Sequence, residues 1–484
     1  MAMYDAVNAI DRSHAPYFAD VHASRGASME AAAAQAAHDT LAALYPDQQA
    51  TFDAALAEDL VGIAPGRAKQ GIQVGKEVAR QILEWRSTDG SDMPETYSLP
   101  ADPGNWQPTG APAAGAHFGS ITPFAVDSSS QFRPAPPPSL TSAEYATAFN
   151  EAKLLGSATS ATRTPFQTDV AMAWRTPAAN QKAWFVDVAA EVAEASGNSL
   201  AENARLFALL GVANNDTLQT SFASKFEYGL WRPVTAIQRA GEDGNADTEA
   251  DPSWTPLHPS TPPYPTYAGN AASIGATFAT VLSTYFGSDN VSFDIQWPQT
   301  EGGPREYGSF SEAAQEAGNS RIWGGIHFRF DSIAGQFVGT NVADYVFENY
   351  FQPVKRGSSP HSMDSGQNPD SNTRALELGA LVANSSDLIL ALHGRNNAPA
   401  ATPAAIKLGE LVADGSDLNL PLQGGNYVPA ATATAIELSA AIDVLFAQDD
   451  DLKRPPWFVA QRTDLGMGWL DVANVRLGRA LSSR

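Results

Sequence analysis

Two positively charged side chains, Lys225 and Arg232, lie seven residues apart in the sequence Lys-Phe-Glu-Tyr-Gly-Leu-Trp-Arg-Pro. In a continuous helix this spacing is about two turns, so both side chains would lie on one face. Two cations on one face can bind one anionic ligand, although such a pair alone is more often a solvated surface. The pair therefore predicts a binding site only if other polar groups accompany it.

A second segment is rich in proline and ends where an alanine-rich helix is expected to begin. Residues 261–270 have the sequence Thr-Pro-Pro-Tyr-Pro-Thr-Tyr-Ala-Gly-Asn, and the prolines exclude a helix through this segment. Gly269 and Asn270 would then offer backbone N–H groups at a helix N-terminus. Hydrogen bonding and the helix dipole both favour an oxyanion at such a position.

A third segment, residues 320–331, contains Arg321, two consecutive glycines, His327 and Asp331. In a helix His327 and Asp331 would be at i and i+4, so the carboxylate can orient the imidazole. A lone histidine beside aromatic residues is more often a core residue than a ligand. Here, three cations, exposed amides and a His–Asp pair occur among apolar helices. Because buried positive charge requires a compensating anion, this combination predicts a buried anion site.

The elements that must position these residues are mainly helical. Hydrophobic residues recur at helical spacing in several alanine-rich segments. We predict helices over residues 1–10, 28–60, 68–86, 141–156, 167–214, 216–240, 270–286 and 311–350. Residues 88–140 are rich in Asp, Gly, Ser and Pro and are expected to form a long covering loop. Convincing alternating strands are absent, so we predict an all-α fold with long Pro/Gly-rich loops.

The C-terminal third contains a repeat with a period of 30 residues. The sequences Ala375-Leu-Glu-Leu-Gly, Ala405-Ile-Lys-Leu-Gly and Ala435-Ile-Glu-Leu-Ser mark its copies. Since about three units are the minimum for a free-standing solenoid, we expect residues 375–445 to form helix–loop units that pack on the main body. We predict a single large helical domain over residues 1–484, with the anion site within residues 141–350.

Composition excludes several classes of partner. The 30 Lys and Arg residues and 53 Asp and Glu residues give a net charge of −23, which would repel nucleic acids and anionic membrane surfaces. The chain has no cysteine, so nitrogen or oxygen atoms must hold any metal. No stretch approaches the ~20 apolar residues of a membrane span, and no signal-peptide pattern is present.

The three segments resemble a known family. Lys225 to Pro233, Pro262 to Tyr267, and Ser320 to Asp331 resemble the signature segments of the vanadium-dependent haloperoxidases and the related phosphatidic-acid-phosphatase-type acid phosphatases. Residues 2–10 also resemble an early helix of bacterial members. The resemblance extends to about residue 350 and does not include the repeats. It implies two helix bundles, with the site in the core of one of them.

Position by position, the resemblance implies vanadate as the cofactor and His327 as the only protein ligand to vanadium. The side chains that would neutralise the vanadate oxygens are those of Lys225, Arg232 and Arg321. In the phosphatase relatives the same histidine is the nucleophile, and Asp331 matches the acid that orients it. Because vanadate, phosphate and sulfate are oxyanions of similar shape, phosphate or sulfate can occupy the same place.

The middle segment departs from the family pattern. After Pro-Pro-aromatic-Pro-x-Tyr the family continues Pro-Ser-Gly-His, whereas this chain has Ala268, Gly269, Asn270 and Ala271. The serine hydroxyl and the second histidine are missing, and we expect the Gly269 and Asn270 amides to bind the cofactor. With a one-residue slip, Asn270 would replace the histidine, but asparagine does not titrate near neutral pH. A lost acid–base group weakens catalysis by ~10²–10⁴-fold.

The resemblance implies a vanadate-dependent haloperoxidase-like enzyme that uses hydrogen peroxide to oxidise a halide or a small organic substrate. Among the halides, bromide and iodide are favoured over chloride. The loss of the second histidine is expected to weaken this activity. One alternative is a phosphomonoesterase with His327 as nucleophile. Another is a non-catalytic oxyanion-binding protein. The sequence leaves a homo-oligomer open, and the resemblance favours a secreted or periplasmic protein although this chain shows no signal peptide.

Overall fold

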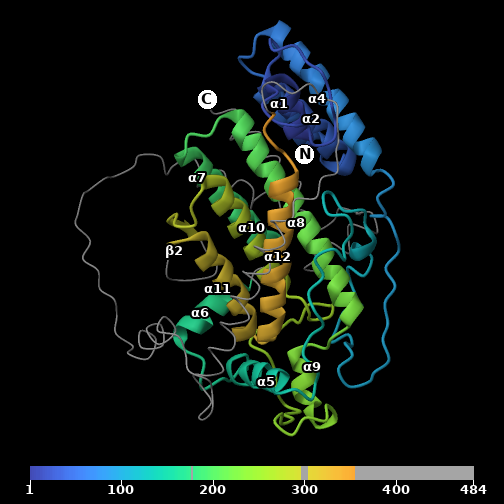
Figure 1. The fold of residues 1–484 in the computed structure, drawn as a ribbon, viewed down its shortest axis with the longest axis vertical. Coiled ribbons are helices and arrows are strands. Elements are labelled where there is room, and N and C mark those ends of the chain that lie inside the picture. Colours follow the sequence, from blue (N-terminus) through green and yellow to red (C-terminus); the bar gives the residue numbers. More distant parts are fainter. Residues whose placement is uncertain (176–177, 296–303, 355–484) are drawn as a thin grey trace, which may run out of the picture. The chain divides into compact units, whose positions relative to one another are not determined.

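The computed structural model describes residues 1–175, 178–295 and 304–354 of the chain (Figure 1). The chain divides into two compact units, residues 1–359 with 457–484, and residues 360–456. All described residues belong to the first unit. The expected repeats over residues 375–445 lie outside the described residues, so the repeats and the single domain over residues 1–484 stay predictions.

The N-terminal helices form one group (Figure 1). They are α1 (Ala2–Asp11), α2 (Met29–Leu44), α3 (Gln49–Asp59) and α4 (Pro65–Arg86). The helices α2 and α4 approach each other closely because Gly71 and Gly75 have no Cβ, which would overlap the backbone of α2. The helix predicted over residues 28–60 is divided at Pro46, which begins a short 3-10 turn, because proline cannot donate the backbone hydrogen bond that continues a helix.

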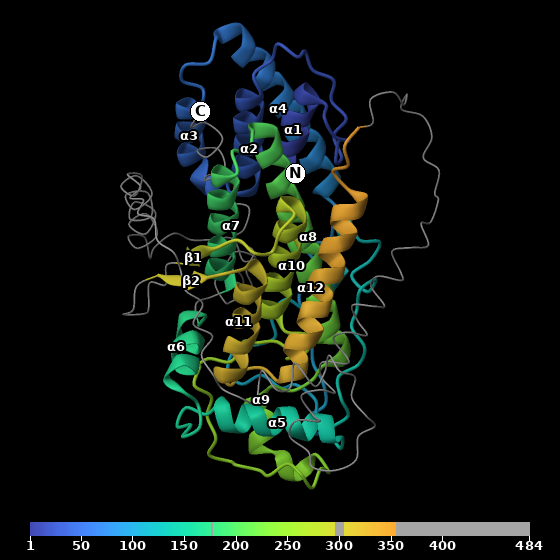
Figure 2. The same cartoon turned by 60° about the vertical axis from the view of Figure 1, so that its left-hand side comes forward.

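A second group of helices contains the larger core. Its members are α6 (Pro165–Ala173), α7 (Ala178–Ala195), α8 (Leu200–Tyr228), α10 (Asn270–Phe286), α11 (Phe310–Trp323) and α12 (Arg329–Asn349). The central helix α10 contacts α8, α11 and α12, and Figures 1 and 2 show these helices side by side. The helices α5 (Ala143–Leu155) and α9 (Pro233–Gln238) contact each other beside this group. The prediction of a mainly helical fold with helix bundles is confirmed.

Helix α8 is continuous where the sequence predicted a break near residue 215. The polar residue Asp216 is buried inside this helix, and its carboxylate accepts hydrogen bonds from the backbone N–H groups of residues 124–126. These residues belong to the loop over residues 88–140, whose only described helical element is a 3-10 turn, Phe118–Ser120. The predicted covering loop is therefore confirmed, and its contact with Asp216 explains a polar residue in the middle of a helix.

Two further boundaries differ from the predictions. The helix predicted over residues 311–350 is two helices, α11 and α12, because the chain turns at Gly324 and Gly325, and Gly325 has a φ of 77°. Residues 167–214 likewise contain α6, α7 and the beginning of α8. A small antiparallel sheet of β1 (Phe293–Ile295) and β2 (Arg305–Tyr307) is also present. These strands are too short to show an alternating pattern in the sequence.

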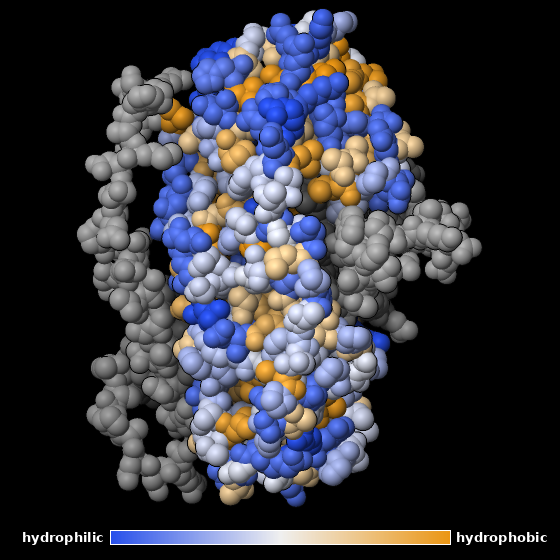
Figure 3. All heavy atoms as spheres, turned by 90° about the vertical axis from the view of Figure 1, so that its right-hand side faces the viewer, coloured by the Kyte–Doolittle hydropathy of each residue, from blue (hydrophilic) through white to orange (hydrophobic). Residues whose placement is uncertain are grey.

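On the face drawn in Figure 3, hydrophobic residues form small groups among hydrophilic ones. Exposed hydrophobic side chains that are scattered in this way are common on protein surfaces. Within residues 1–175, 178–295 and 304–354, no helix combines the length and the apolar character that a bilayer crossing requires.

Candidate functional site

The predicted cations Lys225 and Arg232 do not lie on one helix, contrary to the sequence prediction. Helix α8 ends at Tyr228, where Gly229 adopts a left-handed conformation with a φ of 57°. Arg232 is then the N-cap residue of α9, whose first helical residue is Pro233. The chain therefore turns between the two cations, and both side chains are nevertheless fully buried near the proline-rich segment.

The Lys225 ammonium group is held by backbone carbonyl groups of the proline-rich segment. Its Nζ donates to the carbonyl oxygen of Thr266 at 2.8 Å and also to that of Ala268. The same Nζ lies 5.3 Å from the centre of the Tyr264 ring. Burial and the nearby Arg232 lower the pKa of Lys225 well below its usual value, and Asp331 opposes this shift. An anion bound nearby would stabilise the charged form of this lysine.

Arg232 connects the proline-rich segment with the third segment. Its Nε donates to the Tyr264 carbonyl oxygen at 2.9 Å, and its Nη1 donates to the Ile326 carbonyl oxygen at 2.8 Å. Nη1 also lies 3.1 Å from Nε2 of His327. The other nitrogen, Nη2, is buried and has no hydrogen-bond partner among the described residues. Burial is the main reason that the pKa of Arg232 falls to about 10, so the guanidinium stays charged at neutral pH.

His327 has its two ring nitrogens in different environments. Nδ1 lies 2.9 Å from Oδ2 of Asp331 and 3.0 Å from the hydroxyl oxygen of Thr266. Because a guanidinium can only donate, Nε2 must accept from Arg232, and Nδ1 therefore carries the proton. Burial, followed by the charges of Arg232, Lys225 and Arg321, lowers the pKa of His327 well below its usual value. A neutral imidazole with its lone pair on Nε2 is suited to a metal ligand or a nucleophile.

Asp331 lies in the first turn of α12 and fixes the imidazole. Its Oδ2 accepts from the Phe328 backbone N–H at 2.8 Å and from the Thr266 hydroxyl group. Its Oδ1 is buried and, within the described part of the chain, has no hydrogen-bond partner. Burial raises the pKa of Asp331 to about 6, although Thr266 and Phe328 oppose the shift. The sequence predicted the His–Asp pair as i and i+4 of one helix, but His327 precedes α12 and lies outside it.

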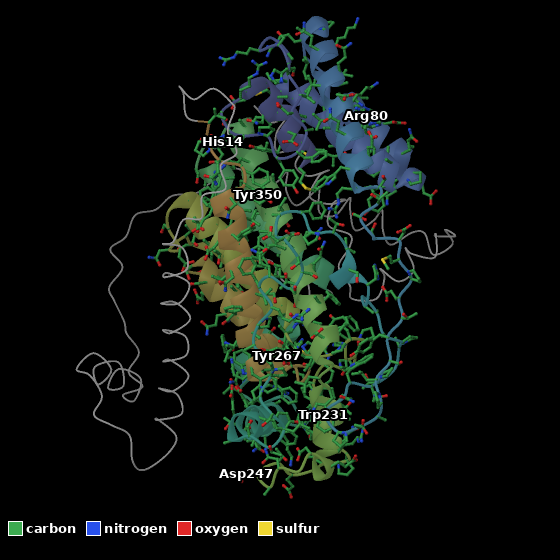
Figure 4. All side chains as sticks on the ribbon, turned by 45° about the vertical axis from the view of Figure 1, so that its right-hand side comes forward. His14, Arg80, Trp231, Asp247, Tyr267 and Tyr350 are labelled. Atoms are coloured by element: carbon green, nitrogen blue, oxygen red, sulfur yellow. The ribbon has the colours of Figure 1, made fainter. Side chains whose placement is uncertain are left out.

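Thr266 is a site residue that the sequence reasoning missed. Its side chain is fully buried and contacts both His327 and Asp331. The signal for it was weak: it has the one aliphatic hydroxyl group between Pro262 and Gly269. Figure 4 labels its chain neighbour Tyr267 and, close to it, Trp231, which precedes Arg232.

Arg321 lies in the last turn of α11 and is partly buried. Its positive charge lowers the pKa values of both Arg232 and His327, which places it within electrostatic range of the site. Its Nη1, however, donates to the Trp174 carbonyl oxygen at 2.8 Å. The structure therefore brings Lys225, Arg232, His327 and Asp331 together and places Arg321 beside them.

The start of α10 differs from the sequence expectation. The Gly269 N–H donates to the Asp331 carbonyl oxygen at 2.8 Å, so it does not face an oxyanion as expected. A Cβ at Gly269 would lie 3.1 Å from the same oxygen, which leaves little room for the serine of the family pattern. Asn270 is the first residue of α10, and its Oδ1 accepts from the Ser221 hydroxyl group at 2.8 Å. Ala271 follows it and is buried.

This arrangement fits an oxyanion better than a simple metal cation. The unpartnered Nη2 of Arg232 is a buried donor, and three positive side chains lie around or beside the neutral His327. In the described ranges, no group of three or more His, Cys, Asp or Glu residues could hold a metal ion. Vanadate needs one imidazole nitrogen and donors for its oxygens, and the residues present supply both.

The chain is similar to known vanadium-dependent proteins. Residues 205–356 match the model of the VCPO second helical-bundle domain. A vanadium chloroperoxidase of Curvularia inaequalis is 29% identical over 307 residues, which cover 49% of this chain and 50% of that protein. The chain thus matches about half the length of this curated relative.

Solved structures of vanadium-dependent peroxidases have folds similar to that of this chain. The structure of a bacterial vanadium-dependent iodoperoxidase has 25% identity and a TM-score of 0.63, and it covers 73% of this chain and 90% of its own. The structure of a bacterial vanadium-dependent chloroperoxidase in its holo form has 15% identity and a TM-score of 0.56. The match covers 72% of this chain and 88% of the chloroperoxidase chain. The matched segment contains most of α8, the whole of α9 to α12 and all of the predicted site residues. Residues 205–356 therefore match a helical-bundle domain of the vanadium haloperoxidase superfamily, and the fold of the chain is similar to that of a solved bacterial vanadium-dependent iodoperoxidase.

Proposed function

We propose that this protein is a vanadate-dependent haloperoxidase that oxidises bromide or iodide with hydrogen peroxide. The observation that carries the proposal is the buried pair of Arg232 and His327: an unpartnered guanidinium nitrogen beside a neutral imidazole. Similarity to vanadium-dependent haloperoxidases supports vanadate as the oxyanion. Bound vanadate would supply a Lewis acid that activates hydrogen peroxide toward halide.

The residues of the chain would hold the cofactor in distinct ways. His327 would bind vanadium through Nε2, because Asp331 and Thr266 occupy Nδ1. The ligand would replace Nη1 of Arg232 as the partner of Nε2. That replacement would turn a second guanidinium N–H group toward the vanadate oxygens, in addition to Nη2. Lys225, held by the carbonyl groups of Thr266 and Ala268, would contribute its charge from one side.

The proposed halides follow from two considerations. Chloride is the most difficult of the three halides to oxidise, and Ala271 provides no imidazole for acid–base catalysis at the family position. A weakened enzyme would therefore oxidise iodide and bromide first. The similarity to a bacterial iodoperoxidase structure supports iodide as a substrate, and we expect chloride oxidation to be the slowest.

A phosphomonoesterase is the second candidate, because Asp331 holds Nδ1 of His327 and leaves Nε2 free to act as a nucleophile once Arg232 moves. A paired assay separates the candidates. Bromide and iodide oxidation is measured with and without added orthovanadate, and phosphate release from a phosphomonoester is measured without it. The proposal requires halide oxidation that depends on vanadate. Phosphate release without halide oxidation would favour the phosphatase, and neither activity would favour a non-catalytic oxyanion-binding protein.

A further inference from the structure

A second buried histidine, His258, lies beside the third segment and has no role in the proposal above. It belongs to the loop that precedes the proline-rich segment, and its exposed fraction is 3%. Its Nε2 is buried and has no hydrogen-bond partner among the residues that the structure describes. Because buried polar atoms normally have a partner, this nitrogen calls for a ligand or water.

The imidazole of His258 packs directly on Gly324. The backbone N–H of His258 donates to the Gly324 carbonyl oxygen at 2.9 Å. A Cβ at Gly324 would overlap Cδ2 and Nε2 of the imidazole, so the ring fills the space that a side chain at position 324 would need. Gly324 lies midway between Arg321 and His327 in the sequence. His258 is thus held next to the segment that carries both of these site residues.

The neighbouring groups that shift the pKa of His258 are positively charged arginines. In order of effect after burial they are Arg321 on α11, Arg175 just after α6 and Arg163 just before it. The imidazole of His327 also interacts with it electrostatically. Burial and these cations lower the pKa of His258 to about 3. The described charged groups that shift its pKa are all cations, and a bound oxyanion would offset their effect.

We propose that His258 supplies the second imidazole of the oxyanion site, in place of the histidine that is missing at position 271. Its Nε2 forms a hydrogen bond to the bound tetrahedral oxyanion. The negative charge of the anion offsets the field of Arg321, Arg175 and Arg163, so His258 takes a proton from solvent when the anion binds. The inference uses the oxyanion site of the proposed function, but it does not depend on peroxidase activity.

Inorganic sulfate is the appropriate probe, because it is tetrahedral and does not itself titrate near neutral pH. Sulfate binding to the full chain is measured by calorimetry near pH 6 in two buffers of different ionisation enthalpy, which gives the number of protons taken up. We compare the wild-type protein with His258→Gln and with the control His14→Gln. Figure 4 shows His14 far from Tyr267 and Trp231, which neighbour the site.

We expect the wild-type protein and His14→Gln to take up protons on binding sulfate, and His258→Gln to take up fewer. Loss of a charged hydrogen bond should weaken sulfate binding by about tenfold or more. Binding to the wild-type protein should also strengthen as the pH falls from about 7 to about 5, with a weaker dependence in His258→Gln. Equal affinity and equal proton uptake in His258→Gln and His14→Gln would overturn the inference.

Two other outcomes separate this inference from the proposed function. If the wild-type protein binds neither sulfate, phosphate nor vanadate, both are wrong, because the oxyanion site does not exist. If His258→Gln weakens sulfate binding but the wild-type protein oxidises no halide, the inference holds and the peroxidase proposal is wrong. Should His258→Gln not fold, His258→Asn replaces it in the same measurements, with the same expected result and the same contradicting result.

Discussion

At the scale of single residues, the Thr266 hydroxyl group contacts both His327 and Asp331, and all three side chains are buried. The sequence reasoning identified His327 and Asp331 because imidazole and carboxylate groups four residues apart suggest chemistry. It missed Thr266 and His258, because their roles depend on contacts with segments about 60 residues away along the chain. Such contacts arise from tertiary structure and leave no local pattern.

Replacement of Thr266 by valine keeps the shape of the side chain but removes the hydroxyl group. We expect Thr266→Val to lower the free energy of unfolding by about 1–3 kcal/mol, because the buried Asp331 loses a hydrogen-bond donor. Sulfate binding should weaken as well, since the His327 imidazole is less firmly held. Urea unfolding and calorimetry measure the two effects. Thr266→Ser, which retains the hydroxyl group, is the control, and equal losses in both variants would contradict a role for the hydrogen bond.

His258 should make stability depend on pH. Its pKa is about 3 in the folded protein and 6.5 in a free imidazole, so between these values the unfolded chain binds a proton that the folded protein does not. The stability that comes from the neutral, buried His258 is therefore fully present above pH 6.5 and is lost as the pH falls toward 3.

His258→Gln removes this dependence. Without oxyanions in the buffer, the free energy of unfolding of the variant should rise relative to that of the wild-type protein as the pH falls from about 7 to about 4. Urea unfolding at several pH values measures the difference. A constant difference would show that His258 keeps an ordinary pKa in the folded protein.

At the scale of elements, glycine residues allow α10 and α12 to lie against each other close to the site. A Cβ at Gly335 would overlap the Gly269 carbonyl oxygen, and one at Gly339 would overlap that of Ser273. The Gly335–Gly269 contact lies next to the hydrogen bond between Gly269 and Asp331. The close packing of α10 on α12 therefore sets the distance between the proline-rich segment and the His–Asp pair. The spacing of the site residues therefore depends on close helix packing.

Gly339→Ala tests this packing away from the site itself. The added methyl group would overlap the backbone of α10, and we expect the free energy of unfolding to fall by about 1–3 kcal/mol. The control is Gly211→Ala on α8, where no described atom lies within 4 Å of the added Cβ. That change should raise stability by about 0.5–1 kcal/mol, because alanine favours a helix. Similar effects of the two substitutions on thermal unfolding would contradict the close approach of α10 and α12.

The sequence predicted the elements unevenly. The helix expected over residues 270–286 agrees with α10, because a proline-rich segment precedes it and Gly287 ends it. The break expected near residue 215 was wrong, since the burial of Asp216 against the covering loop is a tertiary effect. The common helix expected for Lys225 and Arg232 was also wrong. The spacing of Lys225 and Arg232 was compatible with one helix, but the chain leaves α8 at Gly229 and begins α9 at Pro233.

At the scale of the whole molecule, the strongly negative chain encloses a positive site. The net charge of −23 belongs to the full sequence, whereas Lys225, Arg232 and His327 are buried together with one carboxylate, that of Asp331. This contrast in charge is consistent with the proposal of a small oxyanion as the ligand of the buried site. The comparisons with vanadium-dependent proteins support the helical-bundle fold around the site.

The vanadium content of the purified protein tests the central claim most directly. His327 would provide the only protein bond to vanadium, so after incubation with orthovanadate and removal of the excess, the wild-type protein should retain about one vanadium per chain. His327→Ala should retain almost none, and phosphate should displace vanadium from the wild-type protein. Elemental analysis provides the measurement, with His14→Gln as the control. Equal vanadium content in His327→Ala and the wild-type protein would contradict the assignment of this site.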